Sequence, residues 1–133
     1  MNKKRAPAAP TPAELAILCV LWRDGASTVR EVHTALDRRG GRQVGYTTVL
    51  KLMQIMAEKG LVRRDASART HIYRAAVDEG GTKQRLVSDL VDRAFEGSAL
   101  GLVMHALETR PAAATELEQI RALLNERAGG GAS

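Results

Sequence analysis

Apolar residues recur at helical spacing in the first part of the chain, and two of these runs open on capping sequences. Thr11-Pro12-Ala13-Glu14 supplies a capping hydroxyl, a proline at the first helical position and a glutamate that closes a capping box. Thr28-Val29-Arg30-Glu31 repeats the box, and the helices are predicted to end at Asp24-Gly25 and Arg38-Arg39-Gly40-Gly41-Arg42. Their predicted inward faces are Leu15, Leu18, Cys19 and Trp22, and Val29, Val32, His33 and Leu36.

A third amphipathic run extends from Tyr46 to a C-terminal stop at Lys59-Gly60. Its first turn, Tyr46-Thr47-Thr48, has poor helix propensity and hydrogen-bonding side chains, and it follows closely after Arg42. Two interpretations are open: the threonines cap the helix, or they contact a ligand at the positive end of the helix dipole. The predicted buried stripe of this helix is Val49, Leu52, Met53 and Met56.

Two short runs with strand propensity predict a β-hairpin after the third helix. The arms are Leu61-Val62-Arg63-Arg64 and His71-Ile72-Tyr73-Arg74, and a small polar turn over residues 65–70 joins them. Arg63, Arg64 and Arg74 lie on the arms and Arg69 lies at the tip, so the hairpin is basic.

From about Thr82 the pattern is helical again, and Gly97-Ser98 separates the first run from the next. Three short amphipathic helices bury little apolar surface by themselves. We therefore expect them to pack against the first module or against a second copy of the chain. Their predicted apolar stripes are Leu86, Val87, Leu90, Val91, Ala94 and Phe95; Leu100, Val103, Met104 and Leu107; and Leu117, Ile120, Leu123 and Leu124.

The charge of the chain is divided unevenly. Residues 1–74 hold 14 Lys and Arg against 6 Asp and Glu, whereas residues 75–133 hold 6 against 9. A basic first half suggests a polyanion-binding module followed by a region with another role, although an unevenly charged solvated surface is the alternative. With 44% hydrophobic but only 3% aromatic residues, the core must be built from aliphatic side chains, which favours helices.

Several classes of protein are disfavoured by the composition. The chain has no signal-peptide pattern and no apolar stretch long enough to cross a membrane, so we expect a cytoplasmic protein. The single Cys19 excludes an internal disulfide, and three isolated histidines do not suggest a metal site. No nucleophile–base pair or glycine-rich phosphate loop is present, so we expect no enzymatic activity and no cofactor.

Three helices followed by a two-stranded hairpin is the element order of a winged helix-turn-helix. The predicted fold class is therefore mostly α with a small β-hairpin, with a C-terminal helical region after the winged module. In such modules the amino end of the third helix enters the major groove and the hairpin contacts the DNA backbone. The residues predicted to contact DNA are Arg42, Tyr46, Thr47, Thr48, Lys51 and Arg69.

Several longer stretches carry a family resemblance: TPAELAILCVLW, STVREVHTAL, GYTTVLKLMQIMAEKGLVRR, HIYRA, LVDRAFEGSALGLVMHALE and LEQIRALLNE. Over roughly residues 11–126 the chain resembles the BlaI/MecI penicillinase-repressor family of bacterial winged-helix transcription factors. The stretch around the third helix, together with the Gly97-Ser98 segment, is the specific part of the match.

The resemblance implies a homodimeric repressor that binds an inverted-repeat operator in double-stranded DNA through its N-terminal halves. We expect a flexible basic tail over 1–10, a DNA-binding domain over 11–77, a dimerisation domain over 78–127 and a disordered tail over 128–133. The residues predicted for the dimer are Leu86, Leu90, Val103, Leu107, Leu117 and Leu124.

The resemblance also raises the question of the inducing signal. Relatives that respond to β-lactams are cleaved in the C-terminal domain by a membrane sensor-protease, near an Asn-Phe pair. His105-Ala106 occupies the matching place here and is the candidate cleavage region, but its different residues speak against the same protease specificity. Copper-responsive relatives carry a C-terminal cysteine cluster that this sequence lacks.

One alternative class of function stays open at this point. A winged helix can also serve as a protein-interaction module without specific DNA binding. The basic first half of the chain argues against this alternative.

Overall fold

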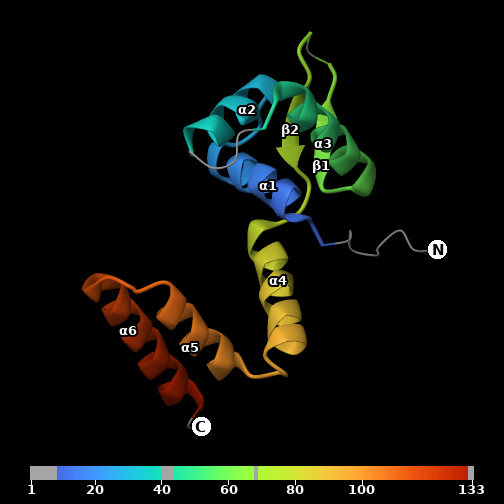
Figure 1. The fold of residues 1–133 in the computed structure, drawn as a ribbon. Coiled ribbons are helices and arrows are strands. Elements are labelled where there is room, and N and C mark those ends of the chain that lie inside the picture. Colours follow the sequence, from blue (N-terminus) through green and yellow to red (C-terminus); the bar gives the residue numbers. More distant parts are fainter. Residues whose placement is uncertain (1–8, 40–43, 68, 132–133) are drawn as a thin grey trace, which may run out of the picture. The chain divides into compact units, whose positions relative to one another are not determined.

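The computed structural model describes residues 9–39, 44–67 and 69–131, which form six helices and one two-stranded hairpin (Figure 1). The predicted fold class is confirmed, with three helices before the hairpin and three after it. The predicted basic tail lies outside the described residues except for its last two positions. The elements are α1 (Pro12–Asp24), α2 (Val29–Arg38), α3 (Tyr46–Lys59), β1 (Val62–Asp65), β2 (Ile72–Ala75), α4 (Glu79–Ala94), α5 (Ala99–Thr109) and α6 (Ala114–Gly131).

Both predicted capping boxes are present. The Thr11 hydroxyl accepts from the backbone N–H of Glu14 at 3.2 Å, and the Glu14 carboxylate accepts from the backbone N–H of Thr11 at 2.9 Å. Thr28 and Glu31 make the same reciprocal pair at the start of α2, at 3.1 and 2.9 Å. Each box therefore satisfies free N–H groups at a helix start and places a carboxylate against the positive end of the dipole.

The hydrophobic core lies between α1, α2, α3 and the hairpin. The α1 face was predicted one position out of register: Leu15, Cys19 and Trp22 are only half-buried, whereas Ile17, Val20 and Leu21 are buried. The reason is that the inward stripe starts at Glu14, a charged residue that the pattern places outside. The core side chains are Ile17, Leu18, Val20, Leu21, Val29, Val32, Val49, Met53, Met56, Leu61, Val62 and Tyr73.

Glu14 is buried because two sets of partners satisfy its carboxylate. Its side chain is 2% exposed, and beyond the capping box it accepts from Lys59 Nζ at 2.7 Å. Lys59 is the last residue of α3, so the pair links the start of α1 to the end of α3. Burial raises the pKa of the Glu14 carboxyl, but the hydrogen bonds from Lys59 and Thr11 and the charge of Lys59 lower it more, so the pKa lies below its ordinary value.

The hairpin is antiparallel and is joined to the helices by a third strand-like contact. The register pairs Val62 with Ala75 and Arg64 with Tyr73. Tyr73 also exchanges two backbone hydrogen bonds with Ser27, at 2.9 and 2.8 Å, so the turn before α2 lies along the outer edge of β2. This pairing sets where the hairpin lies relative to α2.

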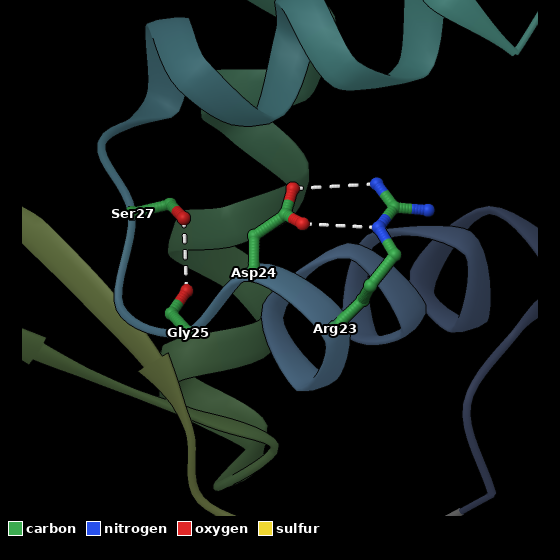
Figure 2. A network of polar contacts seen from close by, with 4 residues as sticks. All are labelled: Arg23, Asp24, Gly25 and Ser27. Atoms are coloured by element: carbon green, nitrogen blue, oxygen red, sulfur yellow. Dashed lines mark hydrogen bonds and ion pairs between the residues drawn. The ribbon is translucent and has the colours of Figure 1, made fainter.

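The turn that carries Ser27 is built by local contacts (Figure 2). Gly25 has φ +85°, a conformation that favours glycine, and its N–H donates to the Leu21 carbonyl at the end of α1. The Ser27 hydroxyl donates to the Gly25 carbonyl at 2.8 Å, and Arg23 makes two hydrogen bonds to Asp24. The sharp reversal after α1 therefore brings the Ser27 backbone into position for Tyr73.

The chain divides into two compact units, one ending at Leu86 and the other beginning at Val87. The division falls inside α4, whereas we predicted a boundary after residue 77. In the second unit, Ser98 caps α5 by accepting from the Gly101 N–H, and the Phe95 and His105 rings meet edge to face at 5.9 Å. The helix α6 extends to Gly131, past the predicted end of the helical region at 127, and the disordered tail over 128–133 stays a prediction.

The Glu14–Lys59 pair gives a prediction about stability. E14Q should lower the free energy of unfolding by about 1–2 kcal/mol at pH 7, because a neutral amide pairs less strongly with the Lys59 ammonium. Since the pKa of Glu14 is lowered in the folded state, its stabilisation is present above the unfolded pKa of about 4.3 and is lost as the pH falls through the folded value. Urea unfolding at pH 7 and pH 3, at one protein concentration, measures both effects.

E31Q is the matched control. Glu31 closes the equivalent capping box at α2, but it is exposed and no lysine pairs with it among the described residues. E31Q should therefore cost less at pH 7. Equal losses for the two variants would show that only the capping box matters and that the Lys59 contact contributes nothing.

Candidate nucleic-acid interface

The amino end of α3 differs from those of α1 and α2. Its N-cap is Gly45, no side chain caps it, and no acidic residue lies in its first turn. Thr47 and Thr48 are exposed and do not cap the helix, so the capping interpretation of these residues is wrong. The N–H groups and the positive end of the dipole are therefore not neutralised by this helix, which is the arrangement that favours an anion.

The exposed face of α3 carries most of the residues predicted to contact DNA. Thr47, Thr48 and Lys51 are exposed there, and Tyr46 is 41% exposed. The opposite face is buried through Val49, Met53 and Met56, so the helix presents its polar side outward. The predicted contact Arg42 lies outside the described residues.

Contacts from α2 hold the first turn of α3. His33 Nε2 lies 2.8 Å from the Val44 carbonyl, which only accepts, so this nitrogen carries the donated hydrogen. The His33 ring meets the Tyr46 ring edge to face at 6.1 Å, and the Arg30 guanidinium lies 5.5 Å from the centre of the Tyr46 ring. His33 was predicted to be packed; it is half-buried and positions the segment before α3.

The sequence interpretation missed this group of contacts. Arg30 and His33 lie one turn apart on α2, but nothing in their spacing indicates that Tyr46 lies against both. The contact depends on how α2 and α3 cross.

A cleft joins α3 to the hairpin. It has a volume of about 410 Å³, and its lining includes Tyr46 from α3, Arg30 from α2, and Arg69 and His71 from the hairpin turn. The structure thus brings two residues of the predicted site, Tyr46 and Arg69, to one cleft. His71, the first residue of the predicted second arm of the hairpin, lines the same cleft.

The hairpin is basic on its outer face. Arg63 and Arg74 are directly opposite in the register, and both are exposed. At the start of the turn, hydrogen bonds from Ser67 and the charge of Arg74 hold the pKa of Asp65 below its ordinary value, and the Ser67 N–H lies 2.9 Å from the carboxylate. Two like charges side by side repel each other, so an anion bound close to them would be stabilising.

Five of the six residues predicted for a dimer lie exposed in the second unit. Leu90, Val103, Leu107, Leu117 and Leu124 are 36–60% exposed, whereas Leu86 is half-buried and is the last residue of the first unit. The candidate cleavage pair His105-Ala106 lies in the middle of α5, where the Thr109 hydroxyl also donates to the His105 carbonyl. A protease would have to unwind a regular helix before it could cut there.

The described residues meet neither the requirements of a metal site nor those of a membrane-spanning helix. No three His, Cys, Asp or Glu side chains within residues 9–39, 44–67 and 69–131 gather in a group that could hold a metal ion. Among the same residues, none of the helices has the length and apolar character needed to cross a membrane.

Comparison with known proteins identifies relatives over most of the chain. The sequence profile of the penicillinase repressor family matches residues 10–126. A transcriptional regulator BlaI of Mycobacterium tuberculosis is 33% identical over 115 residues, which cover 85% of this chain and 80% of the relative. The methicillin resistance regulatory protein MecI of Mammaliicoccus sciuri is 19% identical over 115 residues, covering 86% and 92%.

A solved structure shares the fold. The chain of the hsRosR-S4 complex structure superimposes with a TM-score of 0.51 at 18% sequence identity, covering 92% of this chain and 93% of that chain.

The open end of α3 gives a second prediction. Gly45 has φ −71°, and a Cβ at this position would meet nothing within 4 Å, so a side chain fits. Gly45→Asp should raise the free energy of unfolding by a few tenths of a kcal/mol by capping α3, yet it should weaken binding to any DNA duplex at least tenfold by repelling phosphate.

Gly45→Ser is the matched control, because it adds a cap without a charge. Thermal unfolding and fluorescence anisotropy with a labelled duplex give the two quantities. Equal duplex affinity for Gly45→Asp and Gly45→Ser would show that the end of α3 lies away from the bound DNA.

Proposed function

Because the chain belongs to the penicillinase repressor family of bacterial transcriptional regulators, we propose that it is a homodimeric repressor that binds an inverted-repeat operator. The amino end of α3 enters the major groove, and the hairpin contacts the backbone beside it. Residues 11–77 bind DNA, and the helical region 78–127 forms the dimer.

The observation that carries this proposal is the start of α3. A helix that opens on an uncapped glycine, without an acidic residue, leaves several N–H donors for an outside acceptor. Thr47 and Thr48 add hydroxyls for base edges or phosphates, and their methyl groups can contact the thymine methyl. Lys51, one turn further along the exposed face, supplies charge for the backbone.

The dimer is supported by the apolar surface of the second unit. Exposed large hydrophobic side chains occur on α4, α5 and α6, which is more than scattered surface residues require. This region is also mildly acidic, so it is unsuited to DNA but suited to association with a second copy. A two-fold dimer places two α3 helices on major grooves about one helical turn, or a small multiple of it, apart.

The experiment that tests the proposal is selection of genomic DNA fragments by the purified protein, followed by sequencing of the bound pieces. We expect a palindromic motif upstream of regulated genes, and light scattering should give the mass of two chains in the absence of DNA. Recovery of fragments without a shared motif would contradict specific binding. A monomer that binds a single half-site would contradict the proposed dimer but not the proposed DNA binding.

Two substitutions separate base contacts from backbone contacts. Thr48→Ala should reduce affinity for the selected duplex by on the order of 1 kcal/mol, about fivefold, and should relax the choice of sequence. Arg69→Ala should weaken binding to selected and random duplexes nearly equally and flatten the salt dependence by about one unit of slope for each protomer. Titrations of both duplexes between 50 and 200 mM salt, roughly the range over which such slopes are resolved, measure these effects.

The controls replace the same residue types at exposed positions on other elements. Thr34→Ala changes a threonine of α2, and Arg121→Ala removes a charge from α6. If Thr48→Ala weakens both duplexes in parallel, Thr48 does not read bases; if Arg121→Ala matches Arg69→Ala, the effect is one of net charge.

A further inference from the structure

The recorded partner of the Arg30 guanidinium is an aromatic ring, whereas several other basic side chains pair with a carboxylate. Arg23, Lys59 and Arg93 each lie within 3.0 Å of a carboxylate oxygen. Arg30 is exposed, and among the described residues it makes no ion pair and no hydrogen bond. Its one specific contact is the face of the Tyr46 ring, 5.5 Å from the guanidinium carbon to the ring centre.

The Tyr46 ring is itself fixed from α2. The ring meets the His33 ring in an edge-to-face contact, and the same imidazole donates to the Val44 carbonyl two residues before Tyr46. A guanidinium on an aromatic face loses rotational freedom but keeps its N–H edges for other acceptors. Arg30 is therefore held beside the amino end of α3 with its donors available.

The cleft next to this pair has the composition of an anion site. The residues that line it include Arg30, Arg69, Thr28, Thr70 and His71, and none of its lining residues is acidic. Thr28 and Arg30 come from the start of α2, and Arg69, Thr70 and His71 come from the turn between β1 and β2. Two cations in an open cleft without a counter-ion repel each other, and an anion between them would remove that cost.

We propose that this cleft binds a backbone phosphate of duplex DNA, that Arg30 contacts the phosphate, and that Tyr46 is the positioning residue of Arg30. The proposal rests on the proposed function and extends it, because it adds a backbone contact from α2 and gives Tyr46 a role other than reading bases. A phosphate held there would fix how far the amino end of α3 advances along the groove, since backbone contacts set the register of a protein on the duplex.

The test measures the salt dependence of binding to the duplex recovered by genomic selection and to a random duplex of the same length. Arg30→Met keeps an unbranched side chain but removes the charge that lies over the Tyr46 ring. For each protomer it should lower the slope of log affinity against log salt by about 0.9 on the selected duplex. Arg38→Met removes a charge from an exposed position at the other end of α2 and should change the slope less.

Tyr46 is tested through its coupling to Arg30. Tyr46→Leu should weaken binding about two- to fivefold in the wild-type background, as expected for loss of an exposed cation–π contact, and should have no effect in the Arg30→Met background. Tyr46→Phe keeps the aromatic face, so the slope of log affinity against log salt should equal that of the wild-type protein. Thermal unfolding of each variant checks that the exposed substitutions leave the fold intact.

The outcomes separate this proposal from the proposed function. If the wild-type protein binds the selected duplex and Arg30→Met has the wild-type slope, the phosphate site is wrong and the repressor assignment stands. Equal slopes for Arg30→Met and Arg38→Met, or a Tyr46→Leu effect of the same size in both backgrounds, would also overturn it. If the wild-type protein prefers no duplex, the proposed function itself fails.

Discussion

The proposed DNA-binding surface depends on the two backbone hydrogen bonds that join Ser27 to Tyr73. They connect the turn before α2 to the return strand of the hairpin, so one short segment locates α2 and the hairpin together. Because Tyr73 is also buried in the core, a shift of β2 would disturb both the backbone pairing and the packing. The cleft lined by Arg30 and Arg69 exists only because these two elements are held at one spacing.

The amino ends of α1, α2 and α3 differ in their capping: two are closed by side chains, and the third is not. α1 and α2 begin with capping boxes that close their N–H groups and neutralise their dipoles with glutamates. α3 begins with glycine and exposed threonines and so remains open. Stability at this end would be improved by a cap, as at the other two helices, so its absence is consistent with a surface kept for an anionic partner.

The features that could be predicted from the sequence are those encoded by neighbouring residues. The capping boxes, the glycine after Lys59 and the two arms of the hairpin each depend on a few adjacent positions, and the structure has all of them. The inward position of Glu14 could not be predicted, because a buried carboxylate is tolerated only when a distant lysine pairs with it. The Arg30–Tyr46 contact likewise depends on how two helices meet, which periodicity does not encode.

The two units differ in how much of their apolar surface is buried, and this difference bears on how the proposed repression could be released. The first unit encloses a core of twelve apolar side chains, whereas leucines of α4, α5 and α6 in the second unit remain exposed. One winged module makes few base contacts, so in the proposed dimer the operator affinity would depend on linking two of them. A signal that separated the two copies of that proposed dimer at their exposed apolar faces would therefore release DNA without altering α3. Because the candidate cleavage pair lies inside the regular helix α5, such a signal would act more readily by displacing helices than by cutting the folded chain.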